Sequence, residues 1–369
     1  MLARVRLKAG YDNSANQPAG CLGSGPKTVV PLLQNLLMGK QEFSVPALAN
    51  RIATEADAYR LLESLRWTDG TPDSCPLCGA DGKFYFLAPA DGTDARKTRT
   101  GKDTQRRLWK CATCRKKFSV LTGTVMHGSK IPVRTWLFVS LELSASKNGV
   151  SAREIQRKYD LTAKTAWFML HRLREAMKRD DSAALLSGAV VADETWVGGN
   201  PANRHAKARL AEGHRRWATQ KITVLSVIDK ATGEARSAVV PNVKAHNLRK
   251  AMDGELGVNL GATTLHTDSA KHYERIALVT KGHESVNHEL SEYVRNGVST
   301  NRAEGFFGQL KRSLTGTHHH VSTKHLPRYL AQFDWLYTHC HTTDSQRMRT
   351  LLGTVGGRRL VYRPLTGQP

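Results

Sequence analysis

Two pairs of closely spaced cysteines constrain this chain more than any other feature of its sequence. Cys75 and Cys78 enclose Pro-Leu, Cys111 and Cys114 enclose Ala-Thr, and residues 79–110 separate the pairs. Each C-x-x-C turn lets two thiolates reach one ion, and two such turns complete a tetrahedral site. A redox pair or a disulfide is the alternative, but a redox C-x-x-C normally occurs singly and disulfides belong to oxidising compartments. The spacing therefore predicts a zinc ribbon that holds one structural Zn²⁺.

The residues around the cysteines predict short strands and a basic surface. Aromatic residues at 84–86, 108–109 and 118 indicate strands around the metal, and the polar stretch 90–105 indicates a hairpin tip. A charge run is usually only a solvated face. The chain as a whole, however, carries a formal net charge of +23, which favours a polyanionic partner such as nucleic acid. Phosphate contacts are expected from the cations of the ribbon: Arg106, Arg107, Lys110, Arg115 and Lys116.

The apolar residues are distributed in short runs. No run reaches the roughly 18 residues that a membrane-spanning helix needs, and the N-terminus lacks the apolar core and cleavage site of a secretion signal. We therefore expect a cytoplasmic protein without a membrane partner. Residues 1–43 are rich in Gly, Ser, Asn, Gln and Pro and show no sustained periodicity, which is typical of a disordered arm or of a start assigned too early.

Two helical patterns follow the ribbon, over residues 150–159 and 162–173. Ser151 and Thr162 suit N-caps, and Glu154, three residues after Ser151, completes a capping box. The pattern predicts a helix-turn-helix, whose second helix enters the major groove of DNA. An ordinary helical hairpin is the alternative. On the exposed face of the second helix we expect Lys164, Thr165 and His171.

The second half of the chain alternates strands with helices. In chain order we expect three strands, a helix, a strand, a short helix, a strand and a helix, with the strands at 189–197, 221–229, 235–241, 262–266 and 284–288. Three hairpin-connected strands followed by helix crossovers give a mixed sheet with helices on its faces. Ribonuclease-H-like domains have this order. The predicted fold is thus multidomain α+β: a zinc ribbon plus helix-turn-helix, then a ribonuclease-H-like mixed-sheet α/β catalytic domain.

Three carboxylates of this half form a candidate metal site. Asp193 falls within the first strand, Asp268 ends the fourth, and Glu304 lies in the first turn of the last helix. If the two strands are neighbours, their carboxylates meet at one place, over which the helix can pack. Hard oxygen donors suit Mg²⁺, and two such ions can serve one in-line displacement at phosphorus. The alternative is that these aspartates are ordinary turn residues at strand ends.

Several motifs resemble one family, the bacterial insertion-sequence transposases with an N-terminal zinc ribbon and an ISXO-type catalytic domain (insertion-sequence family fifteen-ninety-five). They include Arg66-Trp67 before the first cysteine pair, the DETWVGG stretch at 193–199, HTDS at 266–269 and NRAEGFFGQLKR at 301–312. The resemblance implies a ribonuclease-H-like fold and a metal triad of Asp193, Asp268 and Glu304 that binds two Mg²⁺ or Mn²⁺ ions. It also implies a catalytic Lys311 on the same helix face as Glu304, next to a DNA-contacting Arg312. Ala192 and Phe307 depart from the usual pattern of the family.

These features together predict a transposase that binds the inverted-repeat ends of an insertion sequence, cuts them and joins their 3′ ends to target DNA. Its partners would be double-stranded DNA and, on that DNA, at least one further copy of the chain. A non-catalytic regulator or a nuclease derived from a transposase is the alternative. The expected domains are 1–43, without defined structure; 44–130, zinc ribbon; 131–180, helix-turn-helix; 186–345, catalytic; and 346–369, a basic tail.

Overall fold

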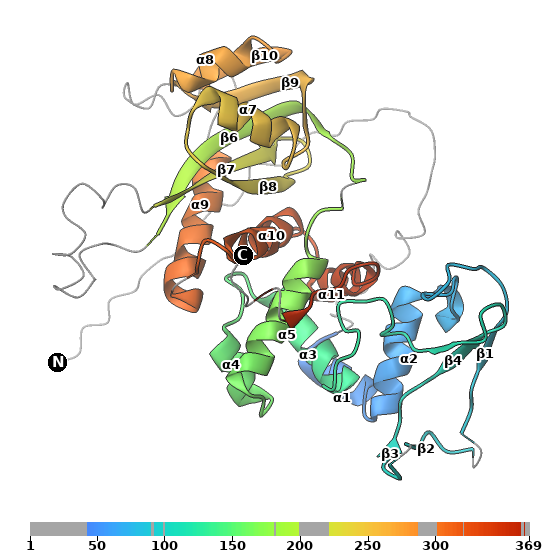
Figure 1. Ribbon diagram of the computed structural model, residues 1–369. Helices are drawn as coiled ribbons and strands as arrows, with labels where there is room; N and C mark the ends of the chain where they lie inside the picture. Colours follow the sequence, from blue (N-terminus) through green and yellow to red (C-terminus); the bar gives the residue numbers. More distant parts are fainter. Residues whose placement is uncertain are drawn as a thin grey trace, which may run out of the picture. The chain divides into compact units, whose positions relative to one another are not determined.

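The computed structural model describes residues 43–89, 92–98, 100–180, 182–198, 221–286, 301–319, 321–362 and 365 (Figure 1). Apart from Phe43, the segment predicted to lack structure lies outside these residues. The helices are α1 (Val45–Arg51), α2 (Glu55–Arg66), α3 (Val133–Ala145), α4 (Ala152–Lys158), α5 (Ala163–Ala176), α7 (Ala245–Asp253), α8 (His272–Ala277), α9 (Asn301–Ser313), α10 (Leu326–Thr338) and α11 (Asp344–Gly353), with a 3-10 turn at Thr68–Gly70 and a π turn at Leu314–His318. The strands are β1 (Phe84–Phe86), β2 (Arg96–Lys97), β3 (Asp103–Thr104), β4 (Trp109–Cys111), β5 (Lys117–Phe118), β6 (Leu186–Val197), β7 (Ile222–Asp229), β8 (Ala235–Val240), β9 (Val258–Asp268) and β10 (Gly282–Val286).

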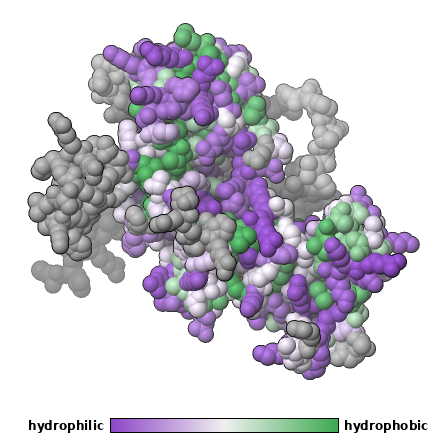
Figure 2. All heavy atoms as spheres, viewed as in Figure 1, coloured by the Kyte–Doolittle hydropathy of each residue, from purple (hydrophilic) through white to green (hydrophobic). Residues whose placement is uncertain are grey.

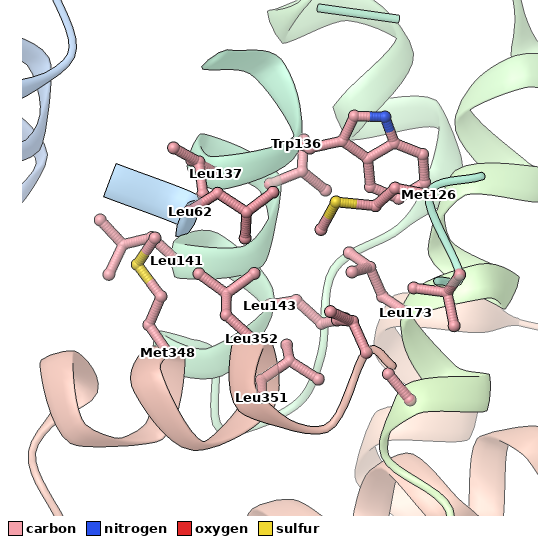
Figure 3. Close-up of a cluster of buried hydrophobic side chains, with 14 of the residues drawn as sticks. Leu62, Met126, Trp136, Leu137, Leu141, Leu143, Leu173, Met348, Leu351 and Leu352 are labelled. Atoms are coloured by element: carbon pink, nitrogen blue, oxygen red, sulfur yellow. The ribbon is translucent and has the colours of Figure 1, made fainter. Parts of the chain in front are cut away.

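A helical core joins residues from both ends of the described chain. Leu62 of α2, Trp136 of α3 and Leu173 of α5 pack with Leu351 and Leu352 of α11 (Figure 3). Burial of such large apolar side chains contributes roughly 1.5–3 kcal/mol each. The expected boundary at residue 130 is therefore not a boundary between cores, because α1 and α2 share a buried core with α3.

The first part of the expected basic tail, 346–369, belongs to helix α11 and is not a tail. Thr343 caps α11 through a capping box with Gln346, and Met348, Leu351 and Leu352 on the inner face of this helix are fully buried. Helix α11 contacts α2, α3 and α5. It was missed because its sequence is polar on average, so that only the spacing of its apolar residues marks it.

Helices α4 and α5 form the predicted pair. The Ser151 hydroxyl accepts from the backbone N–H of Glu154 at 3.1 Å, and Thr162 caps α5 in the same way through Thr165 N–H at 3.2 Å. The carboxylate of Glu154 pairs with Lys158 at 2.8 Å instead of closing the predicted capping box. The two helices and their caps are thus as expected, while a role in DNA binding stays a prediction.

A mixed five-stranded sheet forms the second half in the predicted order of elements. Its strands lie in the order β10-β9-β6-β7-β8, with β6, β7 and β8 antiparallel and β9 and β10 parallel to β6. Helices α7 and α8 cover one face, where Leu225, Leu265 and Tyr273 are buried, and α9 and α10 cover the other, where Val191 and Phe306 are buried (Figure 1). The central strands are buried on both faces, which explains their long apolar runs.

None of the helices in the described part of the chain is long and apolar enough to span a membrane.

Candidate metal centres and nucleic-acid interface

The two cysteine pairs form two matching turns. Cys75 N–H donates to Ala80 C=O at 3.0 Å, and Cys111 N–H donates to Lys116 C=O at 3.1 Å. The residue after each pair has a positive φ, +71° at Gly79 and +57° at Arg115. Glycine adopts this conformation without strain, whereas arginine does so at a cost. Each turn thereby directs two thiols toward the same point.

The four thiols fit one zinc ion. The Sγ atoms of Cys75 and Cys114 are 3.8 Å apart and those of Cys78 and Cys111 are 3.9 Å apart, and all four lie within 4.8 Å of one another. A tetrahedron with Zn–S bonds of about 2.3 Å has edges of about 3.8 Å. A hydrogen bond from the Cys114 backbone lowers the pKa of Cys111 to about 7, which favours the thiolate that binds metal. This site agrees with the predicted structural Zn²⁺ ligands.

Buried Glu63 of α2 attaches the ribbon to the helical core. Its carboxylate accepts from Trp109 Nε1 at 2.9 Å and from Arg107 Nε at 2.7 Å. The guanidinium of Arg107 also lies over the Phe86 ring, 4.2 Å from its centre. Arg107, predicted as a phosphate contact, is therefore committed to a buried ion pair, whereas Arg106, Arg115 and Lys116 are exposed and Lys110 is half-buried.

The strand register brings two of the predicted carboxylates together. In the parallel pair β6–β9, Val190 lies opposite Leu265 and Val191 opposite His266. Continuing this register by two residues places Asp193 beside Asp268. Because side chains alternate along a strand, Asp193 shares the face of Val191, which packs against α9.

Glu304 lies in the first turn of α9, which packs against β6 and β7 through its buried apolar residues. Its side chain is exposed, and a carboxylate near a helix N-terminus is favoured by the helix dipole. Lys311 and Arg312 are exposed further along the same helix, Lys311 two turns after Glu304.

The electrostatics of Asp193 show that the three carboxylates act on one another. Burial is the largest cause that raises the pKa of Asp193 to about 7. A hydrogen bond from the Glu194 N–H opposes this rise, and the charges of Glu194, Asp268 and Glu304 contribute to it. Clustered carboxylates with this mutual repulsion suit a divalent cation. Among the described residues, only the four cysteines bring three or more ligand atoms within 4.8 Å of one another. A cation here would therefore have to draw the carboxylates closer.

A fourth carboxylate near this site was not among the predicted site residues. Glu194 points to the opposite face from Asp193, where it accepts from the hydroxyl of fully buried Tyr273 at 2.6 Å and lies 3.3 Å from His272 Nε2. These contacts tie α8, which follows Asp268, to β6, which carries Asp193. The alternation of strand side chains already places Glu194 opposite to Asp193, but only the structure identifies its partners.

A second group of cations lies beside the ribbon and α5. The guanidinium of Arg172 donates to His127 C=O at 2.8 Å. Burial lowers the pKa of His127, and the charges of Arg359, Arg172 and Arg106 lower it further. The ribbon, α5 and the C-terminal segment thus bring their positive charges to one place. Lys164 is exposed and Thr165 half-buried in the first turn of α5, and their contact with DNA stays a prediction.

His171 does not lie on the exposed face of α5, so this prediction was wrong. Its side chain is fully buried between Trp167, His325 and Tyr329, and neither ring nitrogen has a hydrogen-bond partner. Helix α10 covers the face of α5 that sequence spacing alone had left open. The neighbouring Arg174 is also fully buried, with its guanidinium 3.9 Å from the centre of the Tyr329 ring.

Acidification is expected to destabilise the fold through this buried cluster. Burial, and then the charges of Arg174, His325, Arg328 and His318, lower the pKa of His171 to about 2, and burial followed by Arg174 and His319 lowers that of His318 to about 3. Both values lie below the usual 6.5, so the stabilisation is complete above pH 6.5 and is lost as pH falls toward the folded values. At pH 5.5 each histidine should cost about 1.4 kcal/mol of unfolding free energy.

Urea unfolding at pH 7.5 and 5.5 measures this loss. Replacing His171 by Leu should reduce the difference between the two pH values by about 1 kcal/mol, whereas the same change at exposed His341 should leave it unaltered. An equal pH dependence in wild type and His171→Leu would show that His171 is protonated as easily in the folded as in the unfolded chain.

Comparison with known protein families identifies the class of protein. The model of the ISXO2-like transposase domain matches residues 185–338, and that of the transposase zinc-ribbon domain matches residues 53–117. Both models describe domains of transposases, so the resemblance seen in the sequence motifs is confirmed. A relative from Halobacterium salinarum, an uncharacterized protein in transposable element ISH50, is 25% identical over 310 residues, which cover 82% of this chain and 97% of the relative.

Proposed function

We propose that the protein is a transposase that binds the inverted-repeat ends of an insertion sequence, cuts them and joins the 3′ ends to target DNA. The observation that carries this proposal is the convergence of three carboxylates, Asp193, Asp268 and Glu304, from two neighbouring strands and the helix packed against them. The match to a transposase domain over the same residues supports it.

The architecture of this domain supports a ribonuclease-H-like assignment. Three antiparallel strands precede two strands that are parallel to the first, so that the first strand lies at the centre of the sheet. In this order the middle of β6 and the end of β9 lie side by side at the centre of the sheet, and α9 packs against β6, which supports a shared site for the three carboxylates. The fold thus presents hard oxygen ligands at one place on a rigid scaffold.

Two Mg²⁺ or Mn²⁺ ions bound by these carboxylates would supply Lewis-acid stabilisation of the attacking and leaving oxygens. The contribution of the chain's own residues is to hold the ions and to orient the DNA. Lys311, exposed two turns after Glu304, would contact a phosphate next to the scissile bond, and Arg312 would contact the backbone beyond it.

DNA recognition would fall to the front part of the chain. Arg106, Lys110, Arg115 and Lys116 of the ribbon would neutralise phosphates. Lys164 and Thr165 would enter the major groove from the first turn of α5. Because both ends of the element must be held together for joining, we propose that at least two copies act on the DNA.

The decisive experiment is strand transfer of a labelled, pre-cut transposon end into a plasmid, with wild type compared with Glu304→Gln. Loss of one metal ligand should remove about 4 kcal/mol of transition-state stabilisation, or about a thousandfold in rate, while end binding persists. Glu274→Gln, the same change at an exposed position of α8, is the matched control and should join normally.

The other outcomes separate the competing functions. Nicked plasmid without joined product from the wild type would identify a nuclease. Specific end binding with neither nicking nor joining would identify a DNA-binding regulator.

A further inference from the structure

A groove with a volume of about 600 Å³ lies between α7 and α8, on the face of the sheet opposite to α9. It belongs neither to the ribbon nor to the α4–α5 pair. Hydrophilic residues gather over these two helices at the top of Figure 2. Its walls are formed by Lys244, Ala245, His246, Arg249, Lys271, His272, Arg275 and Ile276.

The groove is cationic and its charges are available. Every polar residue that lines it is Lys, Arg or His, so it has no carboxylate of its own. Lys244, Lys271 and Arg275 are exposed and form no ion pair with a described residue, whereas Arg249 lies 3.5 Å from Asp253 and His272 lies 3.3 Å from Glu194. Uncompensated positive charge in a concave site focuses the field and attracts a polyanion.

Two further features favour an anionic backbone as the occupant. Helix α7 begins at the groove without a side-chain cap. The N–H of Asn247 donates to Lys244 C=O at 2.9 Å, which leaves the N–H groups of Ala245 and His246 for an external acceptor. Ala245 and Ile276 supply the apolar part of the lining, and no amide or hydroxyl side chain lines it. The groove is thus built to contact phosphates rather than to identify bases through amides or hydroxyls.

The groove adjoins the candidate active site. Lys271 and His272 follow Asp268 by three and four residues, and the charge of Asp268 acts on His272. The contact between His272 and Glu194 holds this end of the groove next to the strand that carries Asp193. A DNA backbone in the groove would therefore lie beside the end of β9, on the face of the sheet opposite to Asp193.

We propose that the α7–α8 groove binds the phosphate backbone of the target DNA duplex beside the bond that receives the transposon end. This inference rests on the proposed function and adds the target site to it. A surface of phosphate contacts suits a duplex that is bound through its backbone, whereas recognition of the transposon ends is proposed for the base-reading elements of the front part.

The test compares a Lys244→Ala, Arg275→Ala double variant with a Lys250→Ala, Lys281→Ala control that removes the same charge from exposed positions outside the groove. In the groove variant, binding and cutting of labelled ends should be unchanged. Strand transfer into plasmid at limiting concentration should fall about tenfold and recover as plasmid is added, because phosphate contacts act on target affinity. The charge-conserving double variant Lys244→Arg, Arg275→Lys should restore strand transfer. The thermal unfolding temperature should be the same in all variants.

A second measurement does not depend on joining activity. Binding of the protein to a non-specific duplex should weaken in the groove variant, and the slope of log affinity against log salt should decrease in magnitude by about 2, one for each lost contact. Equal duplex binding and joining in the groove and control variants would overturn the proposal. Loss of end binding in the groove variant would assign the groove to the transposon end instead. A further outcome is that the wild type fails to join DNA while the groove variant still binds the duplex more weakly than the control variant. That result would refute the transposase function but not DNA binding by the groove.

Discussion

Removal of zinc with a chelator is expected to unfold the ribbon, residues 75–118, while the helical core stays folded. The ribbon's own buried cluster consists of Cys75, Trp109, Cys111 and Phe118 with a few partly buried neighbours. So small a core cannot offset the conformational entropy of its loops. Structural zinc typically supplies about 10 kcal/mol or more of folding free energy. The larger helical cluster shares no cysteine ligand and should retain its packing.

Hydrogen exchange with and without chelator measures this effect segment by segment. Protection of the β1, β4 and β5 amides should disappear, and that of α3 and α5 should persist. Cys111→Ser should reproduce the loss without chelator, whereas Cys340→Ser, at an exposed thiol outside the site, should change nothing. Persistent protection of β4 in the metal-free protein would mean that Glu63 and the aromatic contacts hold the ribbon without zinc.

Asp193→Cys is expected to lower strand transfer in Mg²⁺ by about a thousandfold, which corresponds to about 4 kcal/mol, and to recover part of it in Mn²⁺. A thiolate is a soft ligand that binds Mg²⁺ poorly and accepts the softer Mn²⁺ better. The measurement is the ratio of joining rates in the two metals, which reports on ligation and not merely on folding.

Asp193→Ala is the matched comparison, because it removes the carboxylate without offering a replacement ligand. Its activity should stay low in both metals. Equal recovery of the Ala and Cys variants in Mn²⁺, or normal activity of Asp193→Cys in Mg²⁺, would contradict a direct contact between Asp193 and the ion.

Features that depend on local pattern were predictable from the sequence. The cysteine spacing identified the zinc ligands, and Gly79 marked the turn that directs them. Apolar runs separated by turn residues predicted the five strands of the mixed sheet in order. Asp193 and Asp268 could be paired before the structure was known, because strands in such a topology have few possible neighbours.

Features that depend on tertiary packing were not predictable. His171 looked exposed because nothing within α5 reveals that α10 covers it. Arg107 looked like a phosphate ligand because its partner, Glu63, lies 44 residues earlier in the chain. In each case a distant segment decides whether a polar side chain faces water.

The same limit applies to the candidate site. Glu194 stands next to Asp193 in the sequence, but its partner Tyr273 is 79 residues away. The basic groove combines residues from α7 and α8, and in the sequence these appear only as scattered cations. The role of a single Lys or Arg side chain cannot be inferred from the sequence until its neighbours in the fold are known.

The place of helix α11 in the helical core fixes the order in which parts of the protein can fold during synthesis. Ser345 accepts a hydrogen bond at 2.8 Å from the backbone N–H of Phe43, 302 residues earlier, and the leucines of α11 complete the core that supports α2, α3 and α5. The ribosome delivers the chain from its N-terminus, so the helices behind the ribbon must wait for α11 before they can close their core. A nascent chain interrupted before residue 344 would therefore lack not only its end but also a stable core around α2, α3 and α5.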